Sequence, residues 1–258
     1  MIIILALLFG LIFGSFLNVC IYRMPLNKSI VWPGSGCPKC GAPIHFYDNI
    51  PVLSFIILRG KCRSCAEPIS WRYPLVELLT GLGSAVLAYK NQYDPAWLLL
   101  ALAVFYALLV LAFIDLDHFI IPDELSLGIC GVGLLFFWVN PNFQGTLASR
   151  FMQSFGGAAL GFFLLWGIAV AGEKIFKKEA MGGGDIKLMA GLGAVFGWEG
   201  VISTLIIGSL LGSVYGLILM FSKKIGRQAP IPFGPFLSVG ALINLYSLVP
   251  LSAFVINW

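Results

Sequence analysis

Residues 96–114 read AWLLLALAVFYALLVLAFI, a run of 19 residues without a charged side chain. A helix that crosses the hydrocarbon core of a bilayer needs roughly 20 apolar residues, so this run predicts a membrane-spanning helix. Of the 258 residues, 59% are hydrophobic and only 11% are charged. Because soluble domains carry about 25% charged residues, the sequence predicts an all-α polytopic membrane protein.

Six further runs have a similar character, and each is expected to span the membrane: 1–22, 73–89, 125–140, 151–172, 201–221 and 235–256. The first run has no basic start and no small-residue cleavage site, so we expect a retained helix rather than a signal peptide. One further candidate, 188–198, has only 11 residues. At about 1.5 Å per residue it is shorter than the hydrocarbon core, and a re-entrant segment is the alternative.

The positions of the basic residues favour a crossing at 188–198. With that crossing, the loops 23–72, 115–124, 173–187 and 222–234 share one side and contain 14 of the 16 Lys and Arg residues. Without it, Lys223, Lys224 and Arg227 would lie on the opposite side from the first loop. Since basic loops stay in the cytoplasm, the sequence predicts about eight spans, with residues 23–72 cytoplasmic and both termini outside.

The polar insertion 23–72 contains two Cys-x-x-Cys pairs, CPKC at 37–40 and CRSC at 62–65. Two such pairs can arrange four thiolates tetrahedrally around Zn²⁺. Two disulfides are the alternative, but the cytosol keeps thiols reduced. We therefore expect a structural zinc site that helps a small module to fold. The expected parts are a first helix (1–22), a four-cysteine zinc module (23–72) and a transmembrane helical core (73–258).

Acidic residues gather where the predicted third and sixth spans meet the cytoplasm. Asp115 follows the run 96–114 directly, and Asp185 lies in MGGGDIKLM at 181–189. The fourth and fifth spans form a hairpin between them, so both carboxylates are expected at the same membrane face. Ionisable residues at an apolar boundary are costly and therefore indicate a functional site.

Two neighbouring aspartates suit the activation of water. They do not both ionise easily, so one keeps a proton while the other accepts a proton from water, as in aspartic proteolysis. Gly182, Gly183 and Gly184 would let a substrate backbone approach Asp185 without meeting a Cβ atom. The alternative is that Asp185 only caps the sixth helix and that the glycines form a linker.

Three further polar residues are candidate helpers of this site: Asp117, Lys187 and Glu77. Each has a simpler alternative, namely a solvated loop for Asp117, general cytoplasmic charge for Lys187 and a helix-terminal position for Glu77. The stretch GLGAVFG at 191–197 resembles a nucleotide loop but follows no strand. Its glycines are expected to permit close helix packing.

Several stretches together resemble a known family. FIDLDHFIIPD at 113–123 and GGGD at 182–185 are similar to the paired motifs of bacterial type IV prepilin peptidases, the Gly-x-Gly-Asp intramembrane aspartyl proteases. GSFLNVCIYRMP at 14–25, both Cys-x-x-Cys pairs and RYPLVE at 72–77 resemble the amino-terminal half of that family. The resemblance implies that Asp115 and Asp185 are catalytic. It also implies four metal ligands: Cys37, Cys40, Cys62 and Cys65.

The resemblance further implies a bifunctional enzyme of the bacterial inner membrane. It would cleave the basic leaders of type IV prepilins or type II secretion pseudopilins at the cytoplasmic border, and N-methylate the new amino terminus with S-adenosylmethionine. The expected partners are these precursors and the bilayer, with no nucleic acid, and the oligomeric state stays open. Two alternatives are a proton-coupled carrier that uses the same aspartates and a non-enzymatic zinc-bearing scaffold of a secretion or pilus machine.

Overall fold

The protein is described here by a computed structural model covering residues 1–177, 181–222 and 230–254. Lys178, Lys223, Lys224 and Arg227, which entered the charge argument, lie outside these ranges. Within them the chain is helical and contains no β-strand, which confirms the all-α prediction. The α-helices are α1 (Ile2–Arg23), α2 (Leu53–Ile57), α3 (Arg72–Lys90), α4 (Pro95–His118), α5 (Asp123–Leu135), α6 (Leu147–Phe176), α7 (Gly183–Phe221) and α8 (Gly234–Tyr246). Short 3₁₀ helices occupy 24–26, 46–49, 137–139 and 251–254.

Four helical segments are long and apolar enough to cross a membrane: Ile2–Leu26, Pro95–His118, Leu147–Ile175 and Gly183–Phe221. They confirm the prediction of a polytopic membrane protein. The helices α3, α5 and α8, which match other predicted spans, have only 19, 13 and 13 residues. The total of eight spans therefore stays a prediction.

A kink in α7 joins two segments that the sequence separates. The run 188–198 and the predicted span 201–221 both lie in α7, which consists of two helical limbs that meet at this kink. Its only non-helical backbone angles are at Gly197, with φ 70° and ψ −170°. A glycine tolerates this conformation because it has no Cβ atom. The first limb of α7 therefore begins at Gly183 and ends at the kink.

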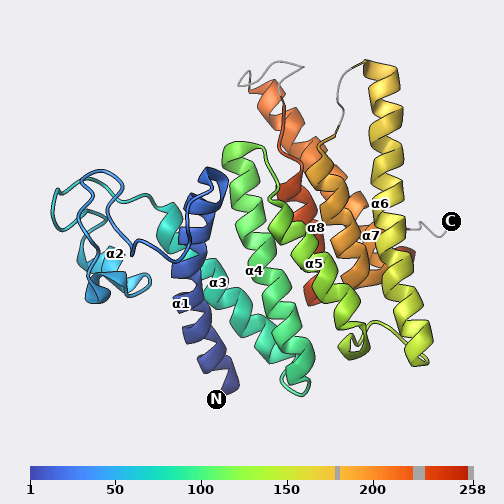
Figure 1. The fold of residues 1–258 in the computed structure, drawn as a ribbon, viewed down its shortest axis with the longest axis horizontal. Helices are drawn as coiled ribbons and strands as arrows, with labels where there is room; N and C mark the ends of the chain where they lie inside the picture. Colours follow the sequence, from blue (N-terminus) through green and yellow to red (C-terminus); the bar gives the residue numbers. More distant parts are fainter. Residues whose placement is uncertain (178–180, 223–229, 255–258) are drawn as a thin grey trace. The chain divides into compact units, whose positions relative to one another are not determined.

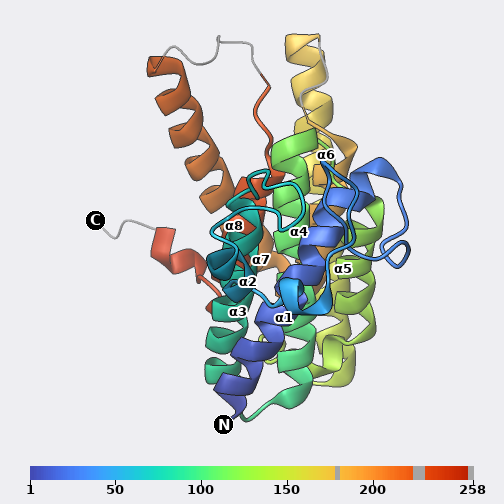
Figure 2. The ribbon, with the colours of Figure 1, turned by 90° about the vertical axis from the view of Figure 1, so that its left-hand side faces the viewer.

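The chain forms two compact units, Met1–Leu98 and Leu99–Trp258, which we call unit 1 and unit 2. In unit 1, α1 packs against α3, as both ribbon views show (Figures 1 and 2). The contact is close because α1 offers glycines to α3. A Cβ atom on Gly14 would lie 2.6 Å from the Cα atom of Glu77. Small residues of this kind let helix backbones approach each other.

The segment 24–71 of unit 1 forms a lobe beside α1 (Figure 1). Its only α-helix is the five-residue α2. Two isolated β-bridges, Gly36 with Pro43 and Lys61 with Pro68, close one turn around each Cys-x-x-Cys pair. The lobe therefore depends on turns rather than on a core of its own.

Unit 2 is organised around α7, which packs against α5, α6 and α8. The closest approach is between α6 and α7, where a Cβ atom on Gly157 would collide with the carbonyl oxygen of Gly193. A Cβ atom on Gly191 would lie 2.9 Å from the carbonyl oxygen of Ser126 on α5. The glycines of 191–197 thus permit close helix packing, as the sequence predicts.

Candidate functional site

Asp115 and Asp185 are buried acids at the ends of two unit 2 helices. Asp115 lies in the last turn of α4 and is 5% exposed, and Asp185 lies in the first turn of α7 and is 8% exposed. The structure brings them together, because the residue before Asp185, Gly184, and the residue that binds Asp115, Gly234, both pack against Ile121. A buried acid is rare unless it is paired or functional.

Asp115 is held by the start of α8. The backbone N–H of Gly234 donates to its Oδ2 atom at 2.9 Å. A Cβ atom on Gly234 would lie 2.7 Å from the same oxygen, so a larger residue would displace the carboxylate. Sequence reasoning missed Gly234, although the alternation of Pro and Gly in PIPFGP at 230–235 indicates an unusual backbone there.

Ile121 packs against the first residues of both α7 and α8. A Cβ atom on Gly184 would lie 2.7 Å from the Cβ atom of Ile121, and one on Gly234 would lie 3.1 Å from its Cδ1 atom. The space at Gly184 is therefore filled by the protein itself. Gly182 and Gly183 are both exposed, and a Cβ atom on Gly183 would meet nothing within 4 Å. Free space for another molecule exists at Gly183.

Asp185 lies in the first turn of α7. Gly182 is the N-cap residue of this helix, and the backbone N–H of Asp185 donates to the Gly182 carbonyl oxygen at 3.2 Å. An acid in the first turn agrees with the helix-capping alternative. However, Oδ1 of Asp185 is buried and has no hydrogen-bond partner. Since buried polar atoms nearly always have a partner, this oxygen is available to a substrate or a water molecule.

The candidate helpers lie in different settings. Lys187 forms an ion pair with Asp123 at 2.7 Å, and this pair joins α7 to α5. Asp117 is exposed in the last turn of α4. Glu77 lies in α3, within unit 1, and is 8% exposed. Lys187 therefore has a structural contact, whereas Glu77 belongs to another unit than the aspartates.

The four cysteines of the lobe gather into one cluster. Their sulfur atoms all lie within 4.8 Å of one another, and those of Cys37 and Cys65 are 3.9 Å apart. A tetrahedron with metal–sulfur bonds of about 2.3 Å has edges of about 3.8 Å. The cluster thus fits a tetrahedral metal ion. The two remaining cysteines, Cys20 and Cys130, lie in α1 and α5.

Two similar turns present these thiols. In the first, the N–H of Cys37 donates to Ala42 and that of Gly41 donates to Cys37; in the second, Cys62 and Ala66 make the matching bonds. Hydrogen bonds from the Cys40 and Lys39 backbones lower the pKa of Cys37 to about 6.

Cys65 differs from Cys37. The Glu67 backbone lowers its pKa, but desolvation and the neighbouring thiols raise it to about 12. Because these thiols are close neighbours, their protons leave in steps that belong to the cluster as a whole. A cation is needed for all four to become thiolates.

Comparisons with known proteins cover nearly the whole chain. Residues 8–91 match the bacterial peptidase A24 N-terminal domain, and residues 102–217 match the type IV leader peptidase family. The chain is 40% identical to a prepilin leader peptidase/N-methyltransferase of Aeromonas hydrophila, over 93% of this chain and 89% of that protein. Proteins of the same name from Pseudomonas aeruginosa and Myxococcus xanthus are 36% and 42% identical, over 93% and 86% of this chain and 88% and 63% of theirs. No solved structure matches.

Proposed function

The chain belongs to the type IV leader peptidase family, and we propose that it removes the leaders of type IV prepilins or pseudopilins with Asp115 and Asp185. The observation that carries this proposal is the pair of buried acids at the adjoining ends of α4 and α7. No cation pairs with either acid among the ion pairs of the described residues. Two acids in such a setting share protons, which is what water activation requires.

The hydrogen bonds suggest the role of each acid. Asp115 accepts the N–H of Gly234, an interaction that suits a carboxylate, so we assign it as the base that removes a proton from water. Asp185, with its unpartnered Oδ1, holds the proton and donates to the scissile carbonyl oxygen. The water oxygen then bonds to the carbonyl carbon. When the C–N bond breaks, the leaving amine takes a proton from the pair.

The second proposed activity is N-methylation of the newly exposed amino terminus, with S-adenosylmethionine as methyl donor. The names of the relatives support it, since they join peptidase and methyltransferase activities. We also propose that the four-cysteine cluster holds Zn²⁺, because four thiols at these distances match its preferred ligands and geometry. Such an ion would stabilise the lobe, and none of the hydrolytic steps above requires it.

The proposed location is the bacterial inner membrane, with the cysteine-bearing lobe and both aspartates facing the cytoplasm. The basic residues of the predicted loops support this orientation. The carrier and scaffold alternatives are not favoured, because the family is one of peptidases.

Leader cleavage by the purified full chain tests the peptidase proposal. Asp115→Asn and Asp185→Asn should each abolish cleavage of a prepilin, followed as the mass of the released amino terminus. Glu124→Gln is the matched control, because Glu124 is an exposed acid in the first turn of α5 and should leave cleavage unchanged. Retention of cleavage by either aspartate variant would contradict the pairing.

Metal analysis tests the zinc proposal. The purified, reduced protein should contain one Zn²⁺ per chain, and Cys62→Ser should lose it. Finding no stoichiometric zinc in the reduced protein would exclude the site. Leader cleavage by the Asp115 and Asp185 pair should continue after the loss of zinc, provided that the protein stays folded.

A further inference from the structure

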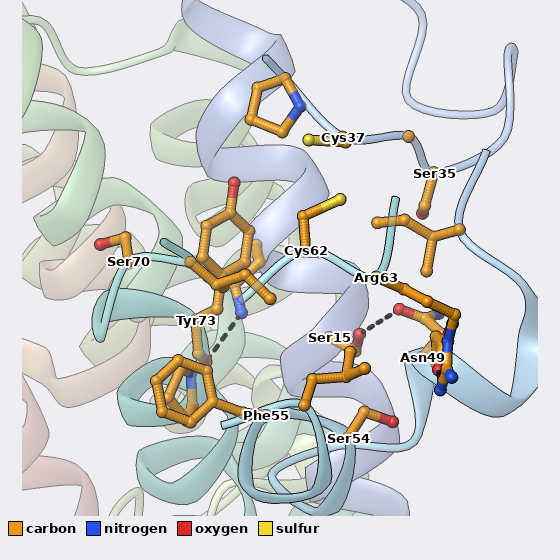
Figure 3. A pocket seen from close by; sticks show the side chains of 18 of the residues that line it. Ser15, Ser35, Cys37, Asn49, Ser54, Phe55, Cys62, Arg63, Ser70 and Tyr73 are labelled. Carbon is orange, nitrogen blue, oxygen red and sulfur yellow. Dashed lines mark hydrogen bonds and ion pairs between the residues drawn. The ribbon is translucent and has the colours of Figure 1, made fainter. Parts of the chain in front are cut away.

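Unit 1 contains a cavity that the aspartate chemistry does not use. It measures about 550 Å³, and all its lining residues belong to α1, α3 and the cysteine-bearing lobe. Sites for small molecules usually measure about 300–1,000 Å³. Figure 3 shows the interior, with Cys37 and Cys62 at one side and Ser15 and Asn49 at another. The cavity is therefore large enough for a cosubstrate.

Glu77 is the unusual acid of the cavity wall. It is 8% exposed, and its Oε2 atom accepts the N–H of Val52 at 2.7 Å. The other two acids of the wall each have a basic partner: Asp48 pairs with Arg63, and Glu67 pairs with Lys39. Within the described part of the chain, no ion pair is formed by Glu77. A buried carboxylate without a cation is costly, so its presence here favours a ligand that brings positive charge or a proton.

A strained turn directs the Val52 N–H to Glu77. Val52 has φ 62° and ψ −48°, and the N–H of Leu53 donates to the Pro51 carbonyl at 2.6 Å. This is a γ-turn with positive φ, which is rare and strained, particularly for a β-branched residue. Strain of this kind persists where the surroundings enforce it and is concentrated at active sites and ligand-binding sites. Here it fixes one oxygen of the carboxylate that lines the cavity.

Asn18 adds an unused acceptor to the same wall. It is 4% exposed, and its side-chain N–H groups donate to the carbonyl oxygens of Gly14 and Tyr73, each at 3.1 Å. These two bonds fix the orientation of the amide. Its Oδ1 atom is buried and has no hydrogen-bond partner. Asn18 thus ties α1 to α3 beside the cavity and retains a buried acceptor for which the described residues supply no donor.

The remainder of the cavity suits an adenosyl group. The rings of Phe55 and Tyr73 line it, and Ser35, Ser54 and Ser70 surround it (Figure 3). Aromatic faces stack on a flat purine base, and hydroxyl groups can bond the hydroxyls of a sugar. The acceptors near Glu77 would then face the amino-acid and methyl-bearing end of the donor.

We propose that this cavity is the methyl-transfer site: it binds S-adenosylmethionine, and Glu77 accepts the proton that the new α-amine must lose. The proposal rests on the methyltransferase function inferred above. An α-amine has a pKa of about 8 and is mostly protonated at neutral pH, so it has no lone pair to attack with. Glu77 removes one proton, and the amine nitrogen bonds to the methyl carbon. The carbon–sulfur bond breaks, its electron pair stays on sulfur, and the sulfonium becomes a neutral thioether.

A synthetic peptide that begins at the new α-amine separates this step from cleavage. With the metal-loaded full chain, Glu77→Gln should still bind S-adenosylmethionine in calorimetry, with an affinity lowered by about tenfold at most because the cationic donor loses one negative neighbour. Its methyl transfer at pH 7 should fall by about 10²-fold, the usual contribution of a general base. The loss should shrink progressively between about pH 7 and pH 9, as the amine deprotonates without help. A purely structural role for Glu77 would give a loss that does not depend on pH.

Three controls decide the other outcomes. Glu124→Gln, which removes an exposed acid of α5 outside the cavity, should methylate at the wild-type rate. Photo-cross-linked S-adenosylmethionine should map to peptides within residues 15–77, and mapping only to unit 2 would overturn the site. Asp185→Asn should still methylate the synthetic peptide.

The same assays separate this proposal from the function on which it rests. If the wild-type protein neither binds the donor nor methylates the peptide, the methyltransferase function itself fails. If it does both but Glu77→Gln is unaffected or is equally impaired at every pH, only the role of Glu77 fails.

Discussion

Replacing Gly184 by alanine should cost the peptidase about 10²-fold in kcat/KM. The added Cβ atom would lie 2.7 Å from the Cβ atom of Ile121, whereas carbon atoms in contact are about 3.5–4.0 Å apart. The start of α7 must therefore shift by about 1 Å relative to Ile121. Asp185 is the next residue and shifts with it. A displacement of about 1 Å at a reacting group can reduce the rate by about 10²-fold, which corresponds to about 2.7 kcal/mol.

Gly128→Ala is the control, because Gly128 is exposed on α5, away from the site, and its Cβ atom would meet nothing within 4 Å. Both substitutions replace a glycine within a helix, where alanine favours the helix by up to about 1 kcal/mol. Thermal unfolding should therefore change little in either variant. Initial rates of leader cleavage, measured by mass spectrometry over a range of precursor concentrations, give kcat/KM. Wild-type cleavage by Gly184→Ala, or an equal loss in Gly128→Ala, would refute the reasoning.

Three further substitutions test other parts of the structure. Ala66→Gly should stabilise the metal-loaded lobe by about 1 kcal/mol, seen as a higher unfolding temperature. Ala66 has φ 58°, and this left-handed conformation costs a residue other than glycine about 1–2 kcal/mol. A lower unfolding temperature would contradict this. Lys187→Met should keep leader cleavage within about fivefold of wild type, because the ion pair between Lys187 and Asp123 is exposed and worth at most about 1 kcal/mol. Abolished cleavage would instead give Lys187 a direct role. The third substitution is Asp48→Asn. The hydrogen bond from Arg63 lowers the pKa of Asp48 in the folded protein. The bond therefore stabilises the fold above the unfolded-state pKa of about 4, and this stabilisation is lost as pH falls through the lower folded-state pKa. The unfolding temperatures of wild type and Asp48→Asn should therefore differ at neutral pH and converge below about pH 4, and a difference that persists in acid would disprove this contribution.

The sequence could predict the fold class because long apolar runs leave few alternatives. A run such as 96–114 is buried in lipid only as a helix, and the structure has α4 there. It could not predict that a single non-helical residue, Gly197, separates the two helical limbs of α7. That outcome depends on Gly197 adopting a positive φ while it packs beside Phe143, and this contact is set by tertiary structure.

The aspartate pair was accessible from sequence because topology alone returns both helix ends to one side. The contacts that hold it were not. Gly234 lies 119 residues after Asp115, and a backbone N–H leaves no pattern in a sequence. In unit 1, the turn at Val52 was equally hidden, since nothing about a valine indicates positive φ. Asn18 did leave a signal, as a polar residue inside the apolar run 1–22.

The cysteine cluster also makes the lobe sensitive to oxidation. With sulfur atoms 3.9 Å apart, Cys37 and Cys65 need to approach by only about 2 Å to reach the length of a disulfide bond. A bound metal ion blocks this reaction by occupying the thiolates, and a chelator removes that protection. Chelation in air would therefore produce a cross-linked lobe as well as a metal-free one. Experiments on metal dependence consequently need a reductant present before the metal is withdrawn, so that the effect of the metal is measured and not the effect of oxygen.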